Sequence, residues 1–441
     1  MAYEWYGYYT NEGKDYVITR PDTPRHWYNY MYNDEYITFA SQVGFGEGFA
    51  QDDMGRRIAL VMNRNFFVCE DEYWSLAGLP INYGYSGYSC IHTAGSTTIS
   101  LKYRNISSKV RIFVPNKGLM EIWSVTLKNE SDKVRKLSLI PYAKTDIDSA
   151  YKPQGYNVAR GGSYKDKNCV YGFFYNQFNS ERNLPIYGYM SSSENITGYD
   201  SRRTAFIGAY NDEQRPKALE ENKGCTDSDC IVEKLCFTLQ NVITLEPNEQ
   251  KTIHYVIGLS FNKEDIVTAD NEWVKNQYSS MMEKYEDRIR RVKIKTPWEN
   301  FDNLINGWMV YATDMGSRWA RVRHNGYRDM SQDTDCLAVL NAPLAWERIK
   351  RVLSYQYENG YAPRTIIDGS LKDRNFSDNT VWLTFAVYDI IKELNKPELL
   401  HEQVNFNNKT TASVYEHIKR SVDFLYNFTG LYGLIRIWGG D

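Results

Sequence analysis

The hydrophobic pattern of the chain changes near residue 263, and this change limits the folds that the chain can adopt. Before it, apolar residues recur at alternate positions in short segments separated by polar turns, as in 120–127 (MEIWSVTL). The clearest segments are 97–104, 108–115, 119–127, 134–142, 232–245 and 250–260. Alternation with period two predicts β-strands, and many such strands in succession predict an antiparallel sandwich.

After residue 297 the apolar residues recur at helical spacing instead. The predicted helices are 301–312, 332–340, 343–357, 379–394 and 412–428. The segment 381–391 (VWLTFAVYDII) is apolar nearly all round, so we expect other helices to enclose it. Helices of alternately enclosed and amphipathic character suggest a toroid of paired helices. The pattern is still incomplete at Asp441, so we expect the toroid to be truncated.

These patterns divide the chain into a β-domain (1–262), a helical linker (263–296) and the first part of a helical toroid (297–441). Asn262 is a candidate cap for the first linker helix, and the charged segment 272–293 is expected to be its main part. Segment 150–224 is rich in Gly, Ser, Asn and Tyr, and we interpret it as long loops that decorate the sandwich.

Charge and composition narrow the classes of function. The chain has 52 Lys and Arg against 55 Asp and Glu, which argues against a nucleic-acid track or a membrane-binding basic patch. No apolar run approaches the roughly 20 residues that span a bilayer, and the first residues do not resemble a signal peptide. We therefore expect a cytoplasmic protein whose seven cysteines are free thiols.

Aromatic residues make up 15% of the chain, with 36 Tyr among them. Aromatic faces with polar edges suit sugar rings, but tyrosine is also common at half-buried sheet positions, and composition alone favours the latter slightly. Metal-site spacings such as His-Glu-x-x-His and Cys-x-x-Cys are missing from the sequence, and so are the P-loop and the Gly-x-Ser-x-Gly motif. The glycine-rich phrase 44–48 (GFGEG) predicts a tight turn rather than a phosphate cradle.

The richest polar cluster is 321–333 (RVRHNGYRDMSQD), between two predicted helices. Its guanidinium and carboxylate groups can form hydrogen bonds with several hydroxyls of one sugar ring. The same groups can form ion pairs between helices, with Asp329 or Ser331 as a helix cap. The residues alone leave both interpretations open.

Four separated motifs resemble those of the cellobiose and chitobiose phosphorylases. Residues 19–36 (TRPDTPRHWYNYMYNDEY) and 44–49 (GFGEGF) look like the amino-terminal signature of that family. Residues 323–333 (RHNGYRDMSQD) are similar to its Arg-Gly-x-Gly-Phe-Arg-Asp-x-x-Gln-Asp motif, and 376–382 (FSDNTVW) to its Ser-Asp-Asp-x-x-Trp helix start. The final GGD matches the opening of its Gly-Asp-Trp-Asn-Asp motif. The motifs occur in collinear order over the whole chain.

This resemblance implies a β-supersandwich joined by helical linkers to an (α/α)₆ barrel. It also implies inverting phosphorolysis of a β-glucosidic bond in a disaccharide or short oligosaccharide, which gives an α-sugar 1-phosphate. One carboxylic acid then suffices, because phosphate arrives already anionic, whereas an inverting hydrolase needs a second carboxylate to activate water. Inorganic phosphate is the co-substrate, and no metal or other cofactor is expected.

Residue by residue, the resemblance assigns Arg323, Arg328 and Asp329 to the donor sugar. Asp333, with Gln332, belongs to the same substrate-binding motif and is expected to orient it, and Asp378 matches a recurrent carboxylate. Asn379 stands where the family usually has a second Asp. The general acid would lie just beyond Asp441, so the catalytic residue is unknown within this chain.

The chain is therefore expected to be the amino-terminal part of a phosphorylase, inactive alone. Its expected partners are a β-linked oligosaccharide, phosphate, and either a second copy or the missing carboxy-terminal half. Two other functions stay open: a glycoside hydrolase on the same toroid, and a non-catalytic carbohydrate-binding or dimerisation module in 1–262. The acceptor sugar cannot be identified from the sequence.

Overall fold

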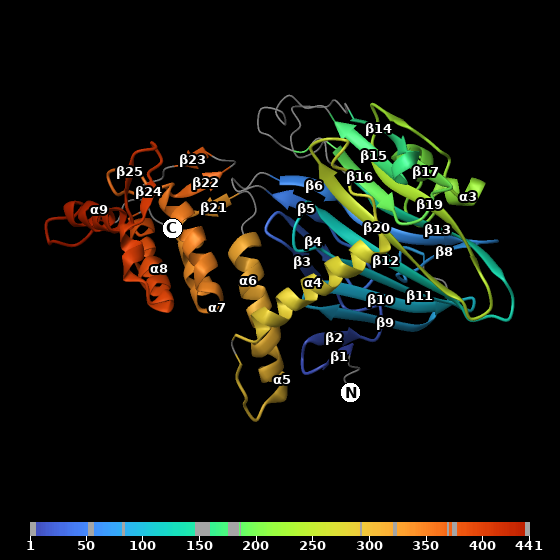
Figure 1. The fold of residues 1–441 in the computed structure, drawn as a ribbon, viewed down its shortest axis with the longest axis horizontal. Coiled ribbons are helices and arrows are strands. Elements are labelled where there is room, and N and C mark those ends of the chain that lie inside the picture. Colours follow the sequence, from blue (N-terminus) through green and yellow to red (C-terminus); the bar gives the residue numbers. More distant parts are fainter. Residues whose placement is uncertain are drawn as a thin grey trace. The chain divides into compact units, whose positions relative to one another are not determined.

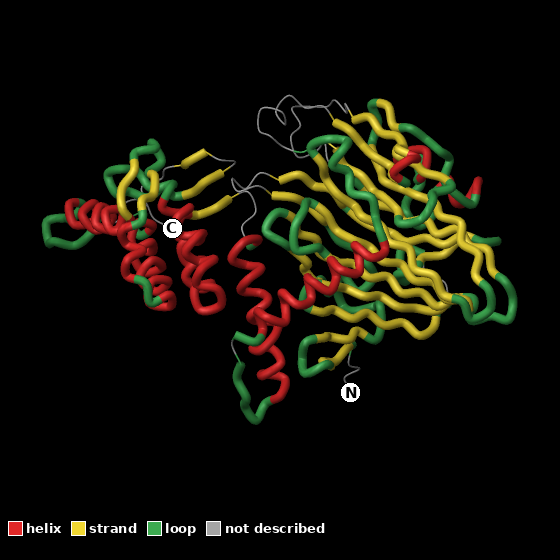
Figure 2. The backbone as a smooth tube through the Cα atoms, in the orientation of Figure 1, coloured by secondary structure: helices red, strands yellow, loops and turns green. Residues whose placement is uncertain are grey.

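The computed structural model describes residues 6–51, 57–81, 84–145, 159–174, 185, 187–291, 293–320, 324–367, 370–372 and 377–436. The chain forms two compact units. The first comprises Met1–Ala50, Arg57–Asp287 and Thr296–Leu304, and the second comprises Gln51–Arg56, Arg288–Lys295 and Ile305–Asp441. Strands dominate the first unit and helices the second (Figure 1, Figure 2), as the change of hydrophobic pattern predicts.

The larger layer of the first unit is an eleven-stranded antiparallel sheet, ordered β1-β2-β9-β10-β11-β12-β20-β16-β15-β14-β18. Its strands are β1 (Gly7–Thr10), β2 (Asp15–Ile18), β9 (Ser86–Thr93), β10 (Ser96–Tyr103), β11 (Ile106–Phe113), β12 (Met120–Asn129), β14 (Ala159–Tyr164), β15 (Cys169–Phe174), β16 (Tyr187–Ser192), β18 (Cys230–Ile231) and β20 (Gln250–Ser260).

Two smaller sheets pack with it. A five-stranded sheet contains β17 (Gly198–Arg202), β19 (Leu235–Leu245), β13 (Arg135–Lys144), β7 (Asn63–Cys69) and β8 (Tyr73–Ser75). A four-stranded sheet contains β3 (Asn29–Tyr32), β4 (Tyr36–Ala40), β5 (Gly48–Gln51) and β6 (Arg57–Val61). The core draws fully buried side chains from facing sheets, such as Val110 and Trp123 against Leu139 and Phe237. This is the predicted sandwich.

The alternating segments of the sequence coincide with β10 to β13, β19 and β20, but the interpretation of 150–224 as loops is wrong for its described part. Strands β14 to β17 lie there, together with η2 (Lys165–Lys167) and the short helices α2 (Arg203–Phe206) and α3 (Lys217–Asn222). Glycines stand where apolar residues would otherwise mark the strands. A Cβ at Gly161 would lie 2.7 Å from Tyr171 O, and one at Gly172 would lie 2.7 Å from Leu235 Cδ1, so these strands carry glycine at crowded positions and have a weak hydrophobic period.

The glycine-rich phrase forms the predicted tight turn between β4 and β5. Ser41 N donates to Phe45 O (2.7 Å), and Gly44 N donates to Ser41 O (3.0 Å). Gly46 has a φ of +152°, and a Cβ there would lie 1.9 Å from Phe39 O. Backbone crowding, rather than a ligand, therefore explains this glycine.

The linker helix α4 (Asn271–Ile289) lies across the large sheet (Figure 1). Tyr278 packs edge-on against Phe113, with ring centroids 5.2 Å apart, and the Arg111 guanidinium lies 4.3 Å from the Tyr278 ring. The linker helix that Asn262 was expected to cap does not begin at residue 263. Asn262 instead donates to Asp265 in a turn (3.0 Å), so this acidic segment satisfies its own polar groups without a helix.

Helices follow the linker as predicted. They are α5 (Glu299–Asn303), the π-helical η3 (Leu304–Met309), α6 (Val310–Trp319), α7 (Tyr327–Leu353), α8 (Asn379–Leu394), the short η4 (Pro397–His401) and α9 (Val414–Asn427). Two small sheets join them: β21 (His324–Gly326), β22 (Thr365–Ile367) and β23 (Ser370–Lys372), and β24 (Gln403–Asn405) with β25 (Thr411–Ser413). Helix α7 breaks at Asn341 (φ −157°), just before Pro343.

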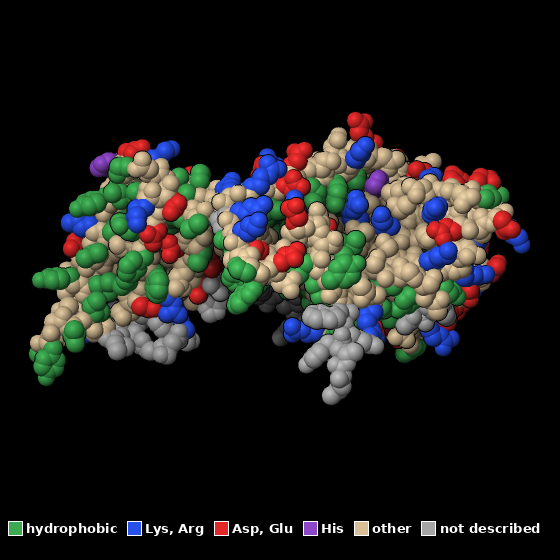
Figure 3. Space-filling view, turned by 90° about the horizontal axis from the view of Figure 1, so that it is seen from below, with side chains coloured by type: hydrophobic (Ala, Val, Ile, Leu, Met, Phe, Trp, Pro, Cys, Tyr) green, Lys and Arg blue, Asp and Glu red, His purple; other side chains and the backbone are tan. Residues whose placement is uncertain are grey.

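The expectation that helix α8 is enclosed is wrong for the described residues. Leu383, Val387 and Ile390 are fully buried, in a cluster shared with α7. On the same helix, however, Phe385 is 54% exposed and Tyr388 59% exposed. The helix therefore buries one apolar face and presents another to solvent. Figure 3 shows further apolar side chains on the surface of the helical part.

Candidate functional site

The motif 323–333 spans the short strand β21 and the first turns of helix α7. Gly326 precedes the helix, and a Cβ on it would lie 2.1 Å from the Asp329 carboxylate, so a larger residue there would displace that side chain. Asp329 lies inside the first turn, and Ser331 is buried and donates to Tyr327 O (3.0 Å). Neither residue is the N-cap, so the cap predicted in the structural interpretation is wrong, whereas an ion pair between helices, its other part, does occur between Arg328 and Asp378.

Arg328 and Asp378 come from two different motifs and meet in the structure. Arg328 Nη1 donates to Asp378 Oδ2 at 2.7 Å, which joins the start of α7 to the residue preceding α8. Their side chains are 40% and 42% exposed. A charged pair that solvent reaches can also be reached by the hydroxyls of a sugar ring, and it offers both donors and acceptors.

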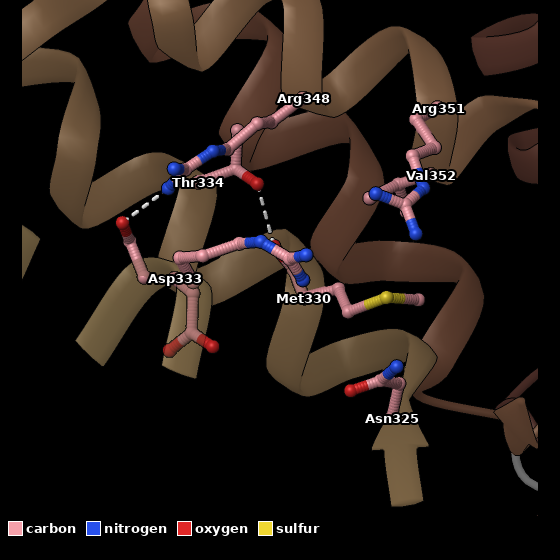
Figure 4. A pocket seen from close by; sticks show the side chains of 9 residues that line it. Asn325, Met330, Asp333, Thr334, Arg348, Arg351 and Val352 are labelled. Carbon is pink, nitrogen blue, oxygen red and sulfur yellow. Dashed lines mark hydrogen bonds between the residues drawn. The ribbon is translucent and has the colours of Figure 1, made fainter. Parts of the chain in front are cut away.

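Asp333 lies elsewhere, in a small cavity of about 70 Å³ within the helical unit (Figure 4). The cavity can hold a few water molecules or one polar group of a ligand, but not a disaccharide. It is lined by Ser317, Arg318, Asn325, Met330, Asp333, Thr334, Arg348, Arg351 and Val352. Three guanidinium groups against one carboxylate make its lining positive.

Sequence reasoning missed the arginines of this cavity. Arg348 donates to Ser317 Oγ, and Thr334 Oγ1 donates to Met330 O (2.6 Å) (Figure 4). Arg348 and Arg351 are three residues apart and so share a helix face. Residues from both halves of α7 line the same cavity, which shows that the break before Pro343 brings this face beside Asp333. The three-residue spacing of Arg348 and Arg351 and the position of Pro343 were the sequence features that could have indicated this cavity.

The other predicted site residues lie either outside the described residues or away from the cavity of Asp333. Arg323 and Asp441 lie outside the described residues. Arg328, Asp329 and Asp378 are not among the residues that line the cavity of Asp333. The structure thus brings together Arg328 and Asp378, and it places Asp333 in a separate environment.

Farther along, two carboxyl groups of α7 and α8 lie close to each other. Burial raises the pKa of Asp335, and the neighbouring Asp389 carboxyl on α8 raises it further. Among the described residues, no group of three or more His, Cys, Asp or Glu side chains is arranged to hold a metal ion. In the same part of the chain, no helix is long and apolar enough to cross a membrane. All seven cysteines are free.

Two family models match the chain. The model described as "Glycosyl hydrolase 94, supersandwich domain" matches residues 14–288. The model described as "Glycosyl hydrolase 94 superfamily, catalytic domain" matches residues 284–441. Together they cover residues 14–441, including both motifs of the Arg328–Asp378 pair.

Two relatives of similar sequence over nearly the whole chain are phosphorylases by name. A 3-O-beta-D-glucopyranosyl-beta-D-glucuronide phosphorylase of Paenibacillus borealis is 28% identical over 99% of this chain and 58% of its own length. An N,N'-diacetylchitobiose phosphorylase of Vibrio proteolyticus is 25% identical over 98% of this chain and 60% of its own. The chain thus spans about three fifths of these relatives. A bacterial glucoamylase solved with acarbose shares the fold, with a TM-score of 0.52, 12% identity, and coverage of 94% of this chain and 71% of its own.

Proposed function

Because the chain belongs to the glycosyl hydrolase 94 family, we propose that it takes part in the phosphorolysis of a β-glucosidic bond. The substrate is a β-linked disaccharide or short oligosaccharide, and the product is an α-sugar 1-phosphate. The observation that supports this best is the contact between Arg328 and Asp378, 50 residues apart in sequence and both accessible. The cytoplasm, which supplies phosphate and retains the sugar phosphate, is the proposed location.

In the proposed reaction, a carboxylic acid protonates the glycosidic oxygen while a phosphate oxygen attacks the opposite face of C1. The bond from C1 to the acceptor breaks, a bond from C1 to phosphate forms, and the configuration at C1 inverts. Asp378 accepts hydrogen bonds from sugar hydroxyls and Arg328 donates to them, and the resemblance assigns Arg323 and Asp329 to the same sugar. Phosphate is the only co-substrate required.

The general acid is proposed to lie beyond Asp441, in the region that relatives have and this chain does not span. The 441-residue chain by itself should then bind sugar without turning it over. Pairing with a polypeptide that supplies that region, or with a second copy, is the proposed route to an active assembly.

The first experiment measures phosphate release from α-glucose 1-phosphate with glucose, N-acetylglucosamine or glucuronate as acceptor. We expect no release by the purified chain, and robust turnover would refute its inactivity. Reducing-sugar release from β-disaccharides in phosphate-free buffer would instead indicate a hydrolase.

The second experiment measures glucose binding by calorimetry. Asp378→Asn should weaken binding at least tenfold, because a charged hydrogen-bond acceptor is lost. The control is Asp423→Asn, which breaks an ion pair of similar exposure with Lys419 (3.4 Å) on α9. Equal affinity in Asp378→Asn and the wild type would refute the proposed role of the Arg328–Asp378 pair.

A further inference from the structure

Three hydrogen bonds, one of them that of the Arg328–Asp378 pair, form a closed ring. They are Arg328 Nη1 to Asp378 Oδ2 (2.7 Å), Tyr327 N to Arg364 O (3.0 Å) and Asn379 Nδ2 to Pro363 O (3.1 Å). The ring closes because its six residues are three pairs of sequence neighbours. It joins the start of α7, the segment before β22 and the start of α8, so the position of each part depends on the other two.

The bond of Asn379 is the buried side-chain bond of this ring. Asn379 is 4% exposed, whereas the side chains of Arg328 and Asp378 are 40% and 42% exposed. Its partner, Pro363 O, is a carbonyl oxygen and can only accept a hydrogen bond. Position 379 must therefore supply a donor, and losing it would leave a buried carbonyl oxygen unpaired.

We propose that Asn379 is a positioning residue that sets the geometry of the Arg328–Asp378 pair by holding Pro363. It acts through the backbone. Pro363 fixes Arg364, whose carbonyl receives the N–H of Tyr327, and Tyr327 precedes Arg328. The pairing of β21 with β22, in which Gly326 lies opposite Thr365, continues the same connection. That the pair binds a sugar rests on the proposed function; the positioning itself does not.

The motif that this segment resembles usually has Asp where this chain has Asn379. An aspartate would donate to Pro363 O only while protonated, and its ionised form would place a negative charge against a carbonyl oxygen. Each element that meets there carries charged groups: Asp378 just before α8, Arg328 and Asp329 at the start of α7, and Arg364 before β22. Burial at this position disfavours an ionised carboxylate. An Asp at position 379 should therefore make the bond to Pro363 O sensitive to pH between 5 and 9, whereas the amide donates throughout that range.

The test is hydrogen–deuterium exchange of peptides covering 324–328 and 363–367 in the full chain, each variant compared with the wild type at the same pH between 5 and 9. Asn379→Ala should accelerate exchange roughly tenfold at every pH, as expected for the loss of one buried hydrogen bond. Asn379→Asp should behave like Asn379→Ala at high pH and approach the wild type at low pH. Recovery on acidification of the same sample distinguishes a broken ring from a misfolded chain.

The matched control is Asn359→Asp, because Asn359 is exposed and its Oδ1 accepts from Tyr361 N (3.1 Å), a role that a carboxylate can keep. Wild-type exchange in Asn379→Ala, or a pH-independent effect in Asn379→Asp, would overturn the proposal. Glucose binding is measured in parallel at both ends of the pH range. If the wild type binds no sugar but exchange follows the expected pattern, the proposed function fails while the positioning role stands.

Discussion

Replacing Arg64 by methionine should destabilise the sandwich by about 3–5 kcal/mol, the usual cost of leaving a buried charge without its partner. Arg64 and Glu121 form an ion pair of 3.1 Å, with both side chains 0% exposed. The Glu121 carboxylate also accepts from Trp123 Nε1 (2.6 Å) and Tyr36 OH (3.1 Å). These two neutral donors remain in the variant but cannot neutralise the carboxylate.

The position of this pair explains why the effect should be global. Arg64 lies on β7, Glu121 on β12 and Tyr36 on β4, so the network joins all three sheets of the first unit. The Arg64 guanidinium also donates to Phe39 O (2.9 Å) and so holds the segment that leads into the turn after β4. At roughly 2–4 °C per kcal/mol for a large domain, the melting temperature should fall by about 10 °C.

A double-mutant cycle tests the reasoning. Glu121→Gln, which keeps the shape but removes the charge, should cost about as much as Arg64→Met, and the combined variant should cost clearly less than the sum. The control is Lys251→Met, which breaks a pair of 3.1 Å with Glu194 at 39% and 34% exposure and should cost less than about 1 kcal/mol. Unfolding is followed by calorimetry and by urea titration. Strict additivity, or losses as small as in the control, would refute the argument.

Two further predictions concern pH and association. His92 is buried between Trp27 O (2.9 Å) and Thr97 Oγ1 (3.0 Å), and burial lowers its pKa to about 4. As the pH falls, the unfolded chain protonates this histidine first, near pH 6.5, so the free energy of unfolding should be highest above that pH and fall by about 3 kcal/mol towards pH 4. Urea unfolding at pH 7 and pH 4.5 should show this decrease in the wild type but not in His92→Gln. Equal decreases in the two proteins would contradict the prediction. The exposed Phe385 and Tyr388 should make the chain self-associate. In analytical ultracentrifugation, the variant with both residues replaced by serine should sediment as a monomer where the wild type does not. The control Tyr210→Ser, at a residue 101% exposed in the sandwich, should leave the sedimentation of the wild type unchanged.

The sequence predicted the fold wherever one periodicity dominated. The segment 379–394 coincides with α8 to the residue, and the alternating segments coincide with strands of the two larger sheets. The family match confirms the supersandwich followed by a helical catalytic domain. Prediction failed where glycine replaced the apolar signal, as in β14 and β15. It also failed at α8, because a helix that is apolar all round does not reveal how many neighbours it has.

The candidate site was less accessible to prediction. Resemblance selected Arg328 and Asp378, but only the fold shows that they touch, because 50 residues separate them. The donor role of Asn379 towards Pro363 depends on the path of a segment that no local pattern fixes. The arginines of the cavity could not be predicted without knowing how the two halves of α7 pack. Pro343 indicates that the helix breaks, but it does not indicate the direction in which the second half continues.

The geometry of α7 separates two residues that the resemblance had grouped. Arg328 and Asp333 are five positions apart, which at 100° per residue places them about 140° apart around the helix. Asp335, seven positions after Arg328, returns to nearly the same side, and it meets Asp389 on α8 just as Arg328 meets Asp378 before α8. Asp333 belongs to the other side, with the arginines from the second half of the helix. Asp333 should therefore influence the proposed sugar site of Arg328 and Asp378 only through the packing of α7, and removing the charge at position 333 should change stability more than sugar binding.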